Sequence, residues 1–297
     1  MARRVAFVLI ILFLTWAGAG GAASITDDSG REISLTSPPG RIVSLYAGHS
    51  ENILALGGGE LLVGVSVADD PALFPGAAVL PARPDGERIL ALAPDLVLIR
   101  PMNEASLGRT IRLLEESGVA VASLAPPTWD GMEDYLARLG ELTGIQGGER
   151  LWREKLAALE KAPPAGERPR VFLESSSRGL MTCSPSSWAA RMIELAGGVN
   201  AAPGAEPVRP GSPLAPFGTE RLLALAEEGL DFYLVQVGPM NNVTEGEVLA
   251  RPWIPALGGA AVALVPEELV SRPSLLRLEE GAKLLARIFS SEGRMSD

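Results

Sequence analysis

Gly86-Glu87-Arg88-Ile89-Leu90-Ala91-Leu92-Ala93 recurs in altered form as Thr219-Glu220-Arg221-Leu222-Leu223-Ala224-Leu225-Ala226, 133 residues further along the chain. Three other pairs of segments keep the same order: residues 41–45 with 170–174, Pro101-Met102-Asn103 with Pro239-Met240-Asn241, and residues 118–122 with 259–263. Their offsets grow slowly from 129 to 141 residues, as loop insertions would produce. The repeat predicts two lobes of like topology.

Short β-type runs alternate with helical runs on both sides of a helical middle. The first half has predicted strands at residues 41–45, 62–67, 96–99 and 119–124, separated by helices, and a second series runs from Arg170 to Phe289. This order is typical of an α/β fold. We predict two Rossmann-like lobes with mainly parallel sheets, joined by one long α-helix, with a ligand cleft between the lobes. The boundaries are residues 24–146 for the N-terminal lobe, 147–163 for the linking helix and 164–297 for the C-terminal lobe.

Residues 1–23 have the pattern of a secretory signal peptide. Arg3 and Arg4 precede an apolar stretch from Val5 to Trp16, which is too short to span a bilayer, and small residues follow up to Ala23. We therefore predict cleavage near Ala23 and an exported, periplasmic protein; a membrane anchor is the alternative. No cysteine lies near that position, so the pattern predicts no lipid anchor.

Composition argues against several classes of protein. The 297 residues are 47% hydrophobic and carry a net charge of −10, so a core is predicted and nucleic-acid binding is not. Cys183 and His49 are the only residues of their types, which predicts no disulfide, no resident metal site and no cofactor. The chain has no Gly-x-Ser-x-Gly, His-Glu-x-x-His or Walker motif, so we predict no enzymatic activity.

A cleft between two lobes is a favoured ligand site, and ligands of open parallel sheets lie beyond the carboxyl ends of the strands. The Pro-Met-Asn triplets follow the predicted strands at residues 96–99 and 232–237. Met102, Asn103, Met240 and Asn241 are therefore candidate ligand contacts that face each other. The alternative is a turn that begins at proline, with methionine in the core.

Aromatic and cationic residues supply the other candidate contacts. Tyr46 and His49 follow the first strand, where a tyrosine could stack on or ligate an iron complex; the alternative is that both are structural. Trp188 could form a ligand wall or cover the core. Four arginines are candidate anion clamps or, alternatively, solvated surface residues: Arg83, Arg100, Arg178 and Arg272.

Glu87 and Glu220 occupy equivalent positions in the repeat. As first-turn acids they would favour the helix dipole, with Asp85 and Thr219 as helix caps. The same geometry would expose one carboxylate on each lobe, where the pair could engage basic pockets of a two-fold partner.

Six segments, taken in their order along the chain, resemble the periplasmic binding proteins of ABC importers for vitamin B12, ferric siderophores and haem. They are residues 39–45, 51–57, 62–66, 87–97, Arg191-Met-Ile-Glu-Leu-Ala-Gly-Gly-Val-Asn200 and 272–287. The resemblance covers nearly the whole mature chain. It implies two α/β lobes bridged by one helix with the ligand between them, small opening motions, and Glu87 and Glu220 docking onto arginines of the permease. The chain departs from the family at residues 227–231, where a Pro-Asp pair is usual, and in its few aromatic residues.

The sequence thus predicts a monomeric binding protein that delivers a metal chelate or cobalamin to an ABC permease. It does not choose between an iron chelate, haem and a corrinoid. The alternatives are a secreted hydrolase and a binder of bare transition-metal ions.

Overall fold

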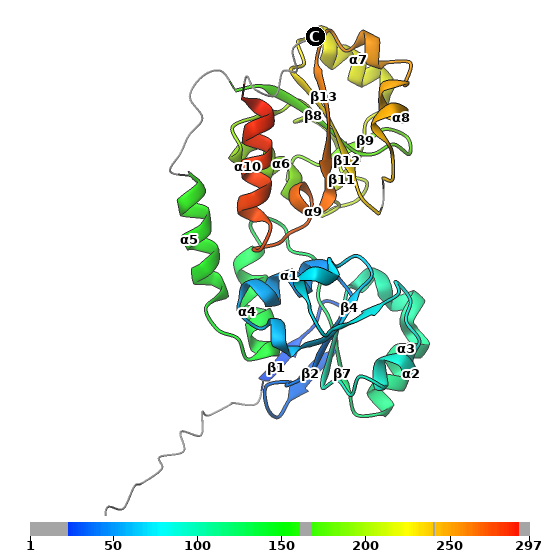
Figure 1. The fold of residues 1–297 in the computed structure, drawn as a ribbon, viewed down its shortest axis with the longest axis vertical. Coiled ribbons are helices and arrows are strands. Elements are labelled where there is room, and N and C mark those ends of the chain that lie inside the picture. The colour runs from blue at the N-terminus through cyan, green and yellow to red at the C-terminus, as the bar shows by residue number, and fades with distance from the viewer. Residues whose placement is uncertain (1–22, 161–167, 240, 291–297) are drawn as a thin grey trace, which may run out of the picture.

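A computed structural model describes residues 23–160, 168–239 and 241–290, which form two α/β lobes stacked along the long axis of the molecule (Figure 1). The predicted signal peptide, apart from Ala23, and Met240 lie outside the described residues. Helix α5 (Gly148–Glu160) runs between the lobes, as the prediction of a linking helix requires. At about 1.5 Å per residue its 13 residues span roughly 20 Å.

The N-terminal lobe (N-lobe) is built on a parallel five-stranded sheet of order β5-β4-β3-β6-β7. Apolar side chains cover both faces of this sheet, which is why its strands read as continuous apolar runs rather than as alternating patterns. The strands are β3 (Ile42–Ser44), β4 (Leu62–Ser66), β5 (Ala78–Leu80), β6 (Leu96–Ile99) and β7 (Ala120–Ser123).

Four helices cover this sheet, two on each face. Helices α2 (Gly86–Leu90) and α3 (Glu104–Glu116) pack on one face through Ile89, Leu107 and Leu114. Helices α1 (Ala47–Ala55) and α4 (Met132–Thr143) pack on the other. A hairpin of β1 (Ala23–Thr26) and β2 (Glu32–Leu35) lies against α4 and β7.

The C-terminal lobe (C-lobe) has a mixed sheet of order β11-β9-β8-β12-β13, with β10 also pairing with β8. Strand β9 returns antiparallel to β8 through a tight turn at Gly179 and Leu180, both with positive φ, so no helical crossover intervenes. The prediction of mainly parallel sheets therefore holds fully for the N-lobe and for β8, β10, β12 and β13. The strands are β8 (Arg170–Ser176), β9 (Met181–Cys183), β10 (Val199–Asn200), β11 (Leu214–Pro216), β12 (Phe232–Val237) and β13 (Ala261–Pro266).

The C-lobe helices also divide between two faces. Helices α7 (Thr219–Glu227) and α8 (Glu245–Leu249) cover a core that belongs to this lobe alone. Helices α6 (Trp188–Leu195), α9 (Glu267–Val270) and α10 (Leu278–Phe289) cover the opposite face. That second core is continuous with residues of the N-lobe such as Ile53 and Leu139. This core therefore extends across both lobes, and it opposes a wide separation of the lobes.

The topology confirms the predicted repeat. Strands β3 and β8 are central in their sheets, β6 and β12 lie beside them, and β7 and β13 follow at the edge. Helices α2 and α7 precede the equivalent strands β6 and β12. The Pro-Met-Asn triplets differ, because Pro101–Asn103 forms a 3-10 turn whereas Asn241 pairs with Gly238 in an isolated bridge.

Candidate functional site

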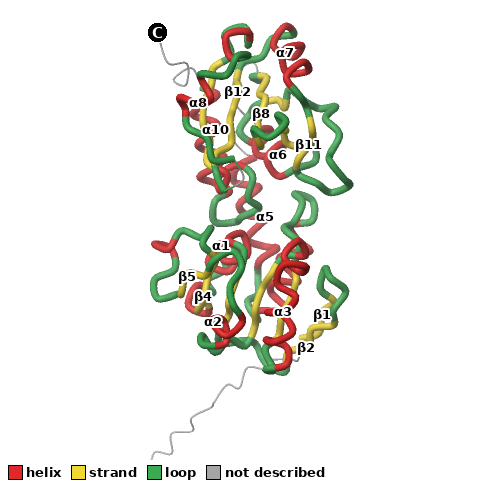
Figure 2. The backbone as a smooth tube through the Cα atoms, turned by 90° about the vertical axis from the view of Figure 1, so that its right-hand side faces the viewer, coloured by secondary structure: helices red, strands yellow, loops and turns green. Residues whose placement is uncertain are grey.

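The carboxyl ends of the central strands face the space between the lobes. Helix α1 follows β3 at the top of the N-lobe (Figures 1 and 2), and α9 follows β13 at the bottom of the C-lobe (Figure 1). We call the surfaces at the carboxyl ends of β3, β5, β6, β8 and β12 the strand-end face. This is the place where the sequence predicts ligand contacts.

Tyr46 and Arg100 form a pair on this face. Arg100 directly follows β6, and its guanidinium carbon lies 4.3 Å from the centroid of the Tyr46 ring, a cation–π geometry. Both side chains are half-buried, and burial raises the pKa of the Tyr46 phenol, so it stays protonated. Within the described part of the chain, the buried Arg100 Nε has no hydrogen-bond partner. The pair offers an aromatic ring and a guanidinium group that makes no ion pair within the described residues.

Gly48 allows the Tyr46 ring to lie across the first turn of α1. A Cβ at position 48 would lie 2.5 Å from Tyr46 Cε1, closer than real Cβ atoms approach. The ring position therefore depends on the absence of a side chain two residues later.

Other N-lobe candidates lie at the same edge. Met102 is 68% exposed in the turn after Arg100, and the Oδ1 of Asn103 is buried without a partner among the residues described. Arg83 is exposed three residues after β5. The structure thus brings Tyr46, Arg100, Met102 and Asn103 together and leaves Arg83 apart from them, in the loop after the edge strand β5.

The C-lobe contributes Arg178 and Asn241. Arg178 is exposed in the turn after β8. Asn241 is 2% exposed: its Oδ1 accepts from the Ser177 N–H at 3.0 Å, and its Nδ2 donates to the Gln236 carbonyl at 2.8 Å. Asn241 therefore fastens the loop after β12 to the loop after β8, and both its polar atoms are already used.

His49 lies in the core directly behind Tyr46. It is fully buried, with Nε2 3.2 Å from the Leu124 carbonyl and Nδ1 2.8 Å from the Tyr135 hydroxyl, which assigns the proton to Nε2. Burial lowers the pKa of His49 to about 4, so the ring is neutral near pH 7. A metal bond to His49 would require one of these two hydrogen bonds to break.

Arg272 joins the lobes instead of standing free as an anion clamp. It is 6% exposed, and its guanidinium pairs at 2.9 Å with Glu51 of α1 and at 2.9 Å with Glu267 of α9. Asn52 adds two bonds to the C-lobe backbone, donating to the Pro273 carbonyl and accepting from the Leu275 N–H. We call these contacts the joint.

Trp188 covers the core, which is one of the two alternatives that the sequence leaves open. It packs with Trp129 of the N-lobe and Trp152 of α5, with ring centroids 4.8 to 5.8 Å apart. All three rings are at most 7% exposed. This tryptophan cluster connects both lobes to the linking helix.

Glu87 and Glu220 are exposed in the first turns of α2 and α7. Asp85 caps α2, since its side chain accepts from the Glu87 N–H at 2.9 Å. The expectation that Thr219 caps α7 is wrong: Gly218 occupies the cap position and makes no side-chain bond.

Glu51, Asn52 and Asp69 are functional candidates that the sequence patterns did not single out. Asp69 accepts from the backbone and side chain of Ser66 at the end of β4, and its other carboxylate oxygen is buried without a partner in the described ranges. Burial raises the pKa of both Glu51 and Asp69. A Ser-x-x-Asp pattern directly after a strand could have identified Asp69.

Across residues 23–160, 168–239 and 241–290, no three histidine, cysteine or acidic side chains are grouped as a metal site would need. Over the same ranges, no helix combines the length and apolar character required to cross a bilayer.

No family model matches the chain. It is 29% identical over 190 residues to a cobalamin-binding protein of Halobacterium salinarum, a match that covers 59% of this chain and 50% of that protein. It is 26% identical over 170 residues to a vitamin B12-binding protein of Vibrio parahaemolyticus, covering 55% of this chain and 61% of that protein. The chain thus spans between half and two thirds of the length of these curated relatives.

Solved structures share the fold over most of the chain. A possible iron-binding periplasmic protein of Staphylococcus epidermidis superposes with a TM-score of 0.68 at 22% identity, covering 84% of this chain and 98% of that chain. Haem-binding and vitamin B12-binding periplasmic proteins of Vibrio cholerae give TM-scores of 0.66 and 0.62, both at 20% identity, covering 84% and 87% of this chain and 99% of each of theirs. The two-lobe fold and the resemblance to this group of binding proteins are therefore confirmed, and these relatives are binding proteins rather than enzymes.

Proposed function

We propose that this chain is the periplasmic solute-binding protein of an ABC importer, and that it holds a metal chelate, haem or a corrinoid on the strand-end face. The observation that carries the proposal is the Tyr46–Arg100 pair, where an aromatic ring and a guanidinium group lie together at the carboxyl ends of central parallel strands. Such places are where open α/β sheets bind ligands.

The chemistry of this face favours a ligand whose metal is already coordinated. The His49 nitrogens are both engaged, and burial raises the pKa of Tyr46 and, to about 11, that of Cys183. These three residues therefore offer no ready imidazole, phenolate or thiolate for a metal. Arg83, Arg100 and Arg178 could instead pair with carboxylates or phosphates at the ligand's periphery. The names of the sequence relatives make cobalamin the first ligand to test.

Delivery requires export and a docking surface. Residues 1–23 would direct export, and Glu87 and Glu220 would each pair with arginines of the permease. Because the lobes share one core, we expect ligand exchange with small relative motion of the lobes.

A ligand screen tests the proposal. The protein lacking residues 1–23 is heated with cyanocobalamin, haemin, a ferric hydroxamate or a ferric catecholate, and one of these should raise its melting temperature. Arg100→Ala should then weaken binding of that ligand at least tenfold. Arg153→Ala is the matched control, because Arg153 is an exposed arginine on α5. No shift with any of the four compounds, or equal affinity of both variants and the wild type, would contradict the proposed site.

A second experiment addresses docking. The double variant Glu87→Ala/Glu220→Ala should keep wild-type ligand affinity, because both residues are exposed on helices α2 and α7 and neither belongs to the Tyr46–Arg100 pair, while its affinity for the permease should fall. Equal permease affinity of the double variant and the wild type would remove the docking role.

A further inference from the structure

Met102 and Val67 are the most exposed large apolar side chains in the described part of the chain, at 68% and 62%. Val67 directly follows β4, and Met102 lies three residues after β6. Strands β4 and β6 are the two neighbours of β3 in the parallel sheet. Both side chains therefore lie at the same edge of the sheet as Tyr46, which follows β3, and they give the proposed ligand site an apolar surface.

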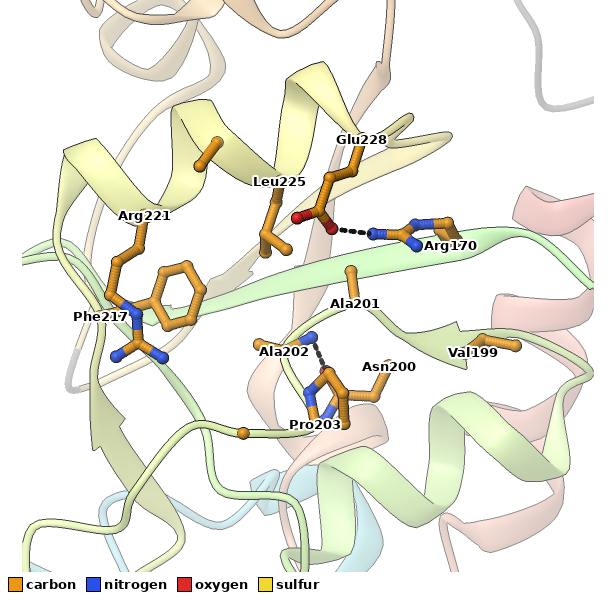
Figure 3. A pocket seen from close by; sticks show the side chains of 12 residues that line it. Arg170, Val199, Asn200, Ala201, Ala202, Pro203, Phe217, Arg221, Leu225 and Glu228 are labelled. Atoms are coloured by element: carbon orange, nitrogen blue, oxygen red, sulfur yellow. Dashed lines mark hydrogen bonds and ion pairs between the residues drawn. The ribbon is translucent and has the colours of Figure 1, made fainter.

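Another exposed apolar side chain lies far from this site. Val199 lines a cavity of about 440 Å³ in the C-lobe, where it pairs with Arg170 at the amino end of β8 (Figure 3). The charged side chains of that cavity are engaged with their neighbours. Arg170 donates to Glu228 at 3.1 Å, and the guanidinium carbon of Arg221 lies 4.2 Å from the centroid of the Phe217 ring. The cavity therefore does not indicate a particular ligand, and Met102 is the more informative residue.

A 3-10 turn holds the backbone of Met102 in place. Pro101 fixes φ at the start of the turn, and the Asn103 N–H donates to the Arg100 carbonyl at 2.8 Å. Helix α3 begins at the next residue, Glu104. Since the side chain projects from this turn into solvent, a chemical change there should act locally on the site and leave the fold intact.

The sulfur of Met102 is the most accessible among the methionines that the structure describes. Met132 and Met192 are fully buried, and Met181 is partly buried. A peroxide in solution reaches an exposed thioether but is kept from a buried one, and it converts the thioether to a sulfoxide. Met102 should therefore be oxidised before these three residues.

We propose that Met102 is an oxidation-sensitive residue of the ligand site, and that its conversion to methionine sulfoxide by a peroxide weakens ligand binding. In this step the sulfur attacks one peroxide oxygen, and an S–O bond forms as the O–O bond breaks. The other oxygen takes up the proton of the first and leaves as water. Sulfur loses two electrons and the peroxide gains them. The inference rests on the proposed function and adds regulation to the same site.

The expected loss of affinity follows from the change in polarity. A sulfoxide turns a flexible apolar side chain into a polar one. A ligand that packs on Met102 and Val67 must then remove water from the S–O group, and burial of a polar group without a partner is unfavourable. Methionine sulfoxide reductases reverse the modification, so the loss of affinity should also be reversible.

Limited oxidation of the protein lacking residues 1–23 tests the inference. After treatment with hydrogen peroxide, which is then removed, peptide mapping by mass spectrometry should find sulfoxide at Met102 before Met132, Met181 or Met192. Isothermal titration with cyanocobalamin, haemin or the ferric chelate that the screen selects should show affinity at least about fivefold lower. The melting temperature of the free protein should stay the same, and reductases for both sulfoxide epimers should restore the affinity.

Three variants show whether Met102 is responsible. Met102→Leu has no sulfur, so its affinity, whatever its starting value, should not change on treatment with peroxide. Met102→Gln carries a polar group and should bind more weakly than the wild type without any peroxide. Met181→Leu is the matched control, which should bind as the wild type and keep its sensitivity to peroxide.

The outcomes separate this inference from the function on which it rests. If the wild type with oxidised Met102 binds as tightly as the untreated protein, or if Met102→Leu loses as much affinity to peroxide as the wild type, the inference fails while the proposed function stands. Oxidation of Met132, Met181 or Met192 ahead of Met102 would also overturn it. If the untreated wild type binds none of the four screened compounds, the proposed function itself fails.

Discussion

The two regions where the lobes approach each other differ in how their polar groups are used. At the joint, the guanidinium of Arg272 pairs with two carboxylates, and the side chain of Asn52 both donates to and accepts from the C-lobe backbone. On the strand-end face, Arg100 Nε and Asn103 Oδ1 are buried without partners in the part of the chain that the structure describes. At the joint, Glu51 Oε2 is also buried without a partner among the described residues, but the charged side chains there pair with one another across the lobes. On the strand-end face, Arg100 stacks on Tyr46 and makes no ion pair within the described residues, so its charge is left able to bind a ligand.

This difference assigns separate tasks to the two regions. The joint and the tryptophan cluster hold the lobes in one arrangement, with a hydrophobic core that passes from one lobe to the other. The strand-end face is then presented by a rigid frame, which reduces the ordering that a ligand must impose on binding. Changes at the joint should therefore alter stability, and changes on the strand-end face should alter affinity.

The largest loss of stability is expected from Arg272→Met, because this change leaves Glu51 buried with only Arg277, 3.5 Å away, as a charged partner. Removing one member of a buried ion pair typically costs about 3–5 kcal/mol of unfolding free energy. Urea unfolding followed by tryptophan fluorescence measures the loss.

The double variant Glu51→Gln/Arg272→Met separates the two roles of Arg272. Because it removes both charges, it should recover most of the lost stability and keep ligand affinity within about twofold. A tenfold loss of affinity in this stable double variant would mean that Arg272 contacts the ligand, as the sequence alone suggests.

The next largest effect is the pH dependence that His49 gives to the stability of the fold. Its pKa is about 4 in the folded protein against 6.5 for a free histidine, so the unfolded chain binds the proton more tightly between these values. Stability should fall as pH drops from 6.5 to 4, by at most about 3 kcal/mol at 1.36 kcal/mol per pKa unit. Urea midpoints measured across this range test the expectation.

His49→Gln is the control, since carboxylates also titrate at acid pH. Glutamine can hydrogen-bond but does not titrate, so the difference between wild type and variant isolates the histidine. A wild-type profile that parallels the variant from pH 6.5 to 4 would show that His49 is not held neutral by burial.

Asn241→Leu should have a smaller effect on stability. It removes the side chain that joins the loops after β8 and β12 and leaves the Ser177 N–H and Gln236 carbonyl without that partner, which costs about 1–3 kcal/mol. If Asn241 acted mainly through the ligand, affinity would fall while the urea midpoint stayed unchanged.

The architecture was accessible from sequence because it rests on local patterns. The repeat around Gly86–Ala93 and Thr219–Ala226 correctly predicts equivalent helices ahead of equivalent strands. The β8–β9 hairpin was missed because residues 174–181 show no apolar alternation, and the turn depends on positive φ at Gly179 and Leu180.

The roles of single polar residues were less accessible, since they depend on distant partners. His49 is neutral because burial lowers its pKa, and its ring partners Tyr135 and Leu124 are 86 and 75 residues away in the sequence. Arg272 and its partner Glu51 are 221 residues apart. In contrast, Arg100 could be placed from sequence, because a residue directly after a buried strand lies at the sheet's carboxyl edge whatever packs around it.

The smallest change in stability is expected from Gly48→Ala, and this variant tests the strand-end face most directly. The new Cβ would lie 2.5 Å from Cε1 of Tyr46, so the ring must turn away and lose its stacking on Arg100. Position 48 is helical and alanine favours helix over glycine, so the free energy of unfolding should change by less than about 1 kcal/mol. Ligand affinity should nevertheless fall severalfold, as isothermal titration with the compound that the screen identifies would measure. Unchanged affinity together with unchanged stability would mean that the ring position set by Gly48 plays no part in binding, and Arg100 alone would carry that side of the site.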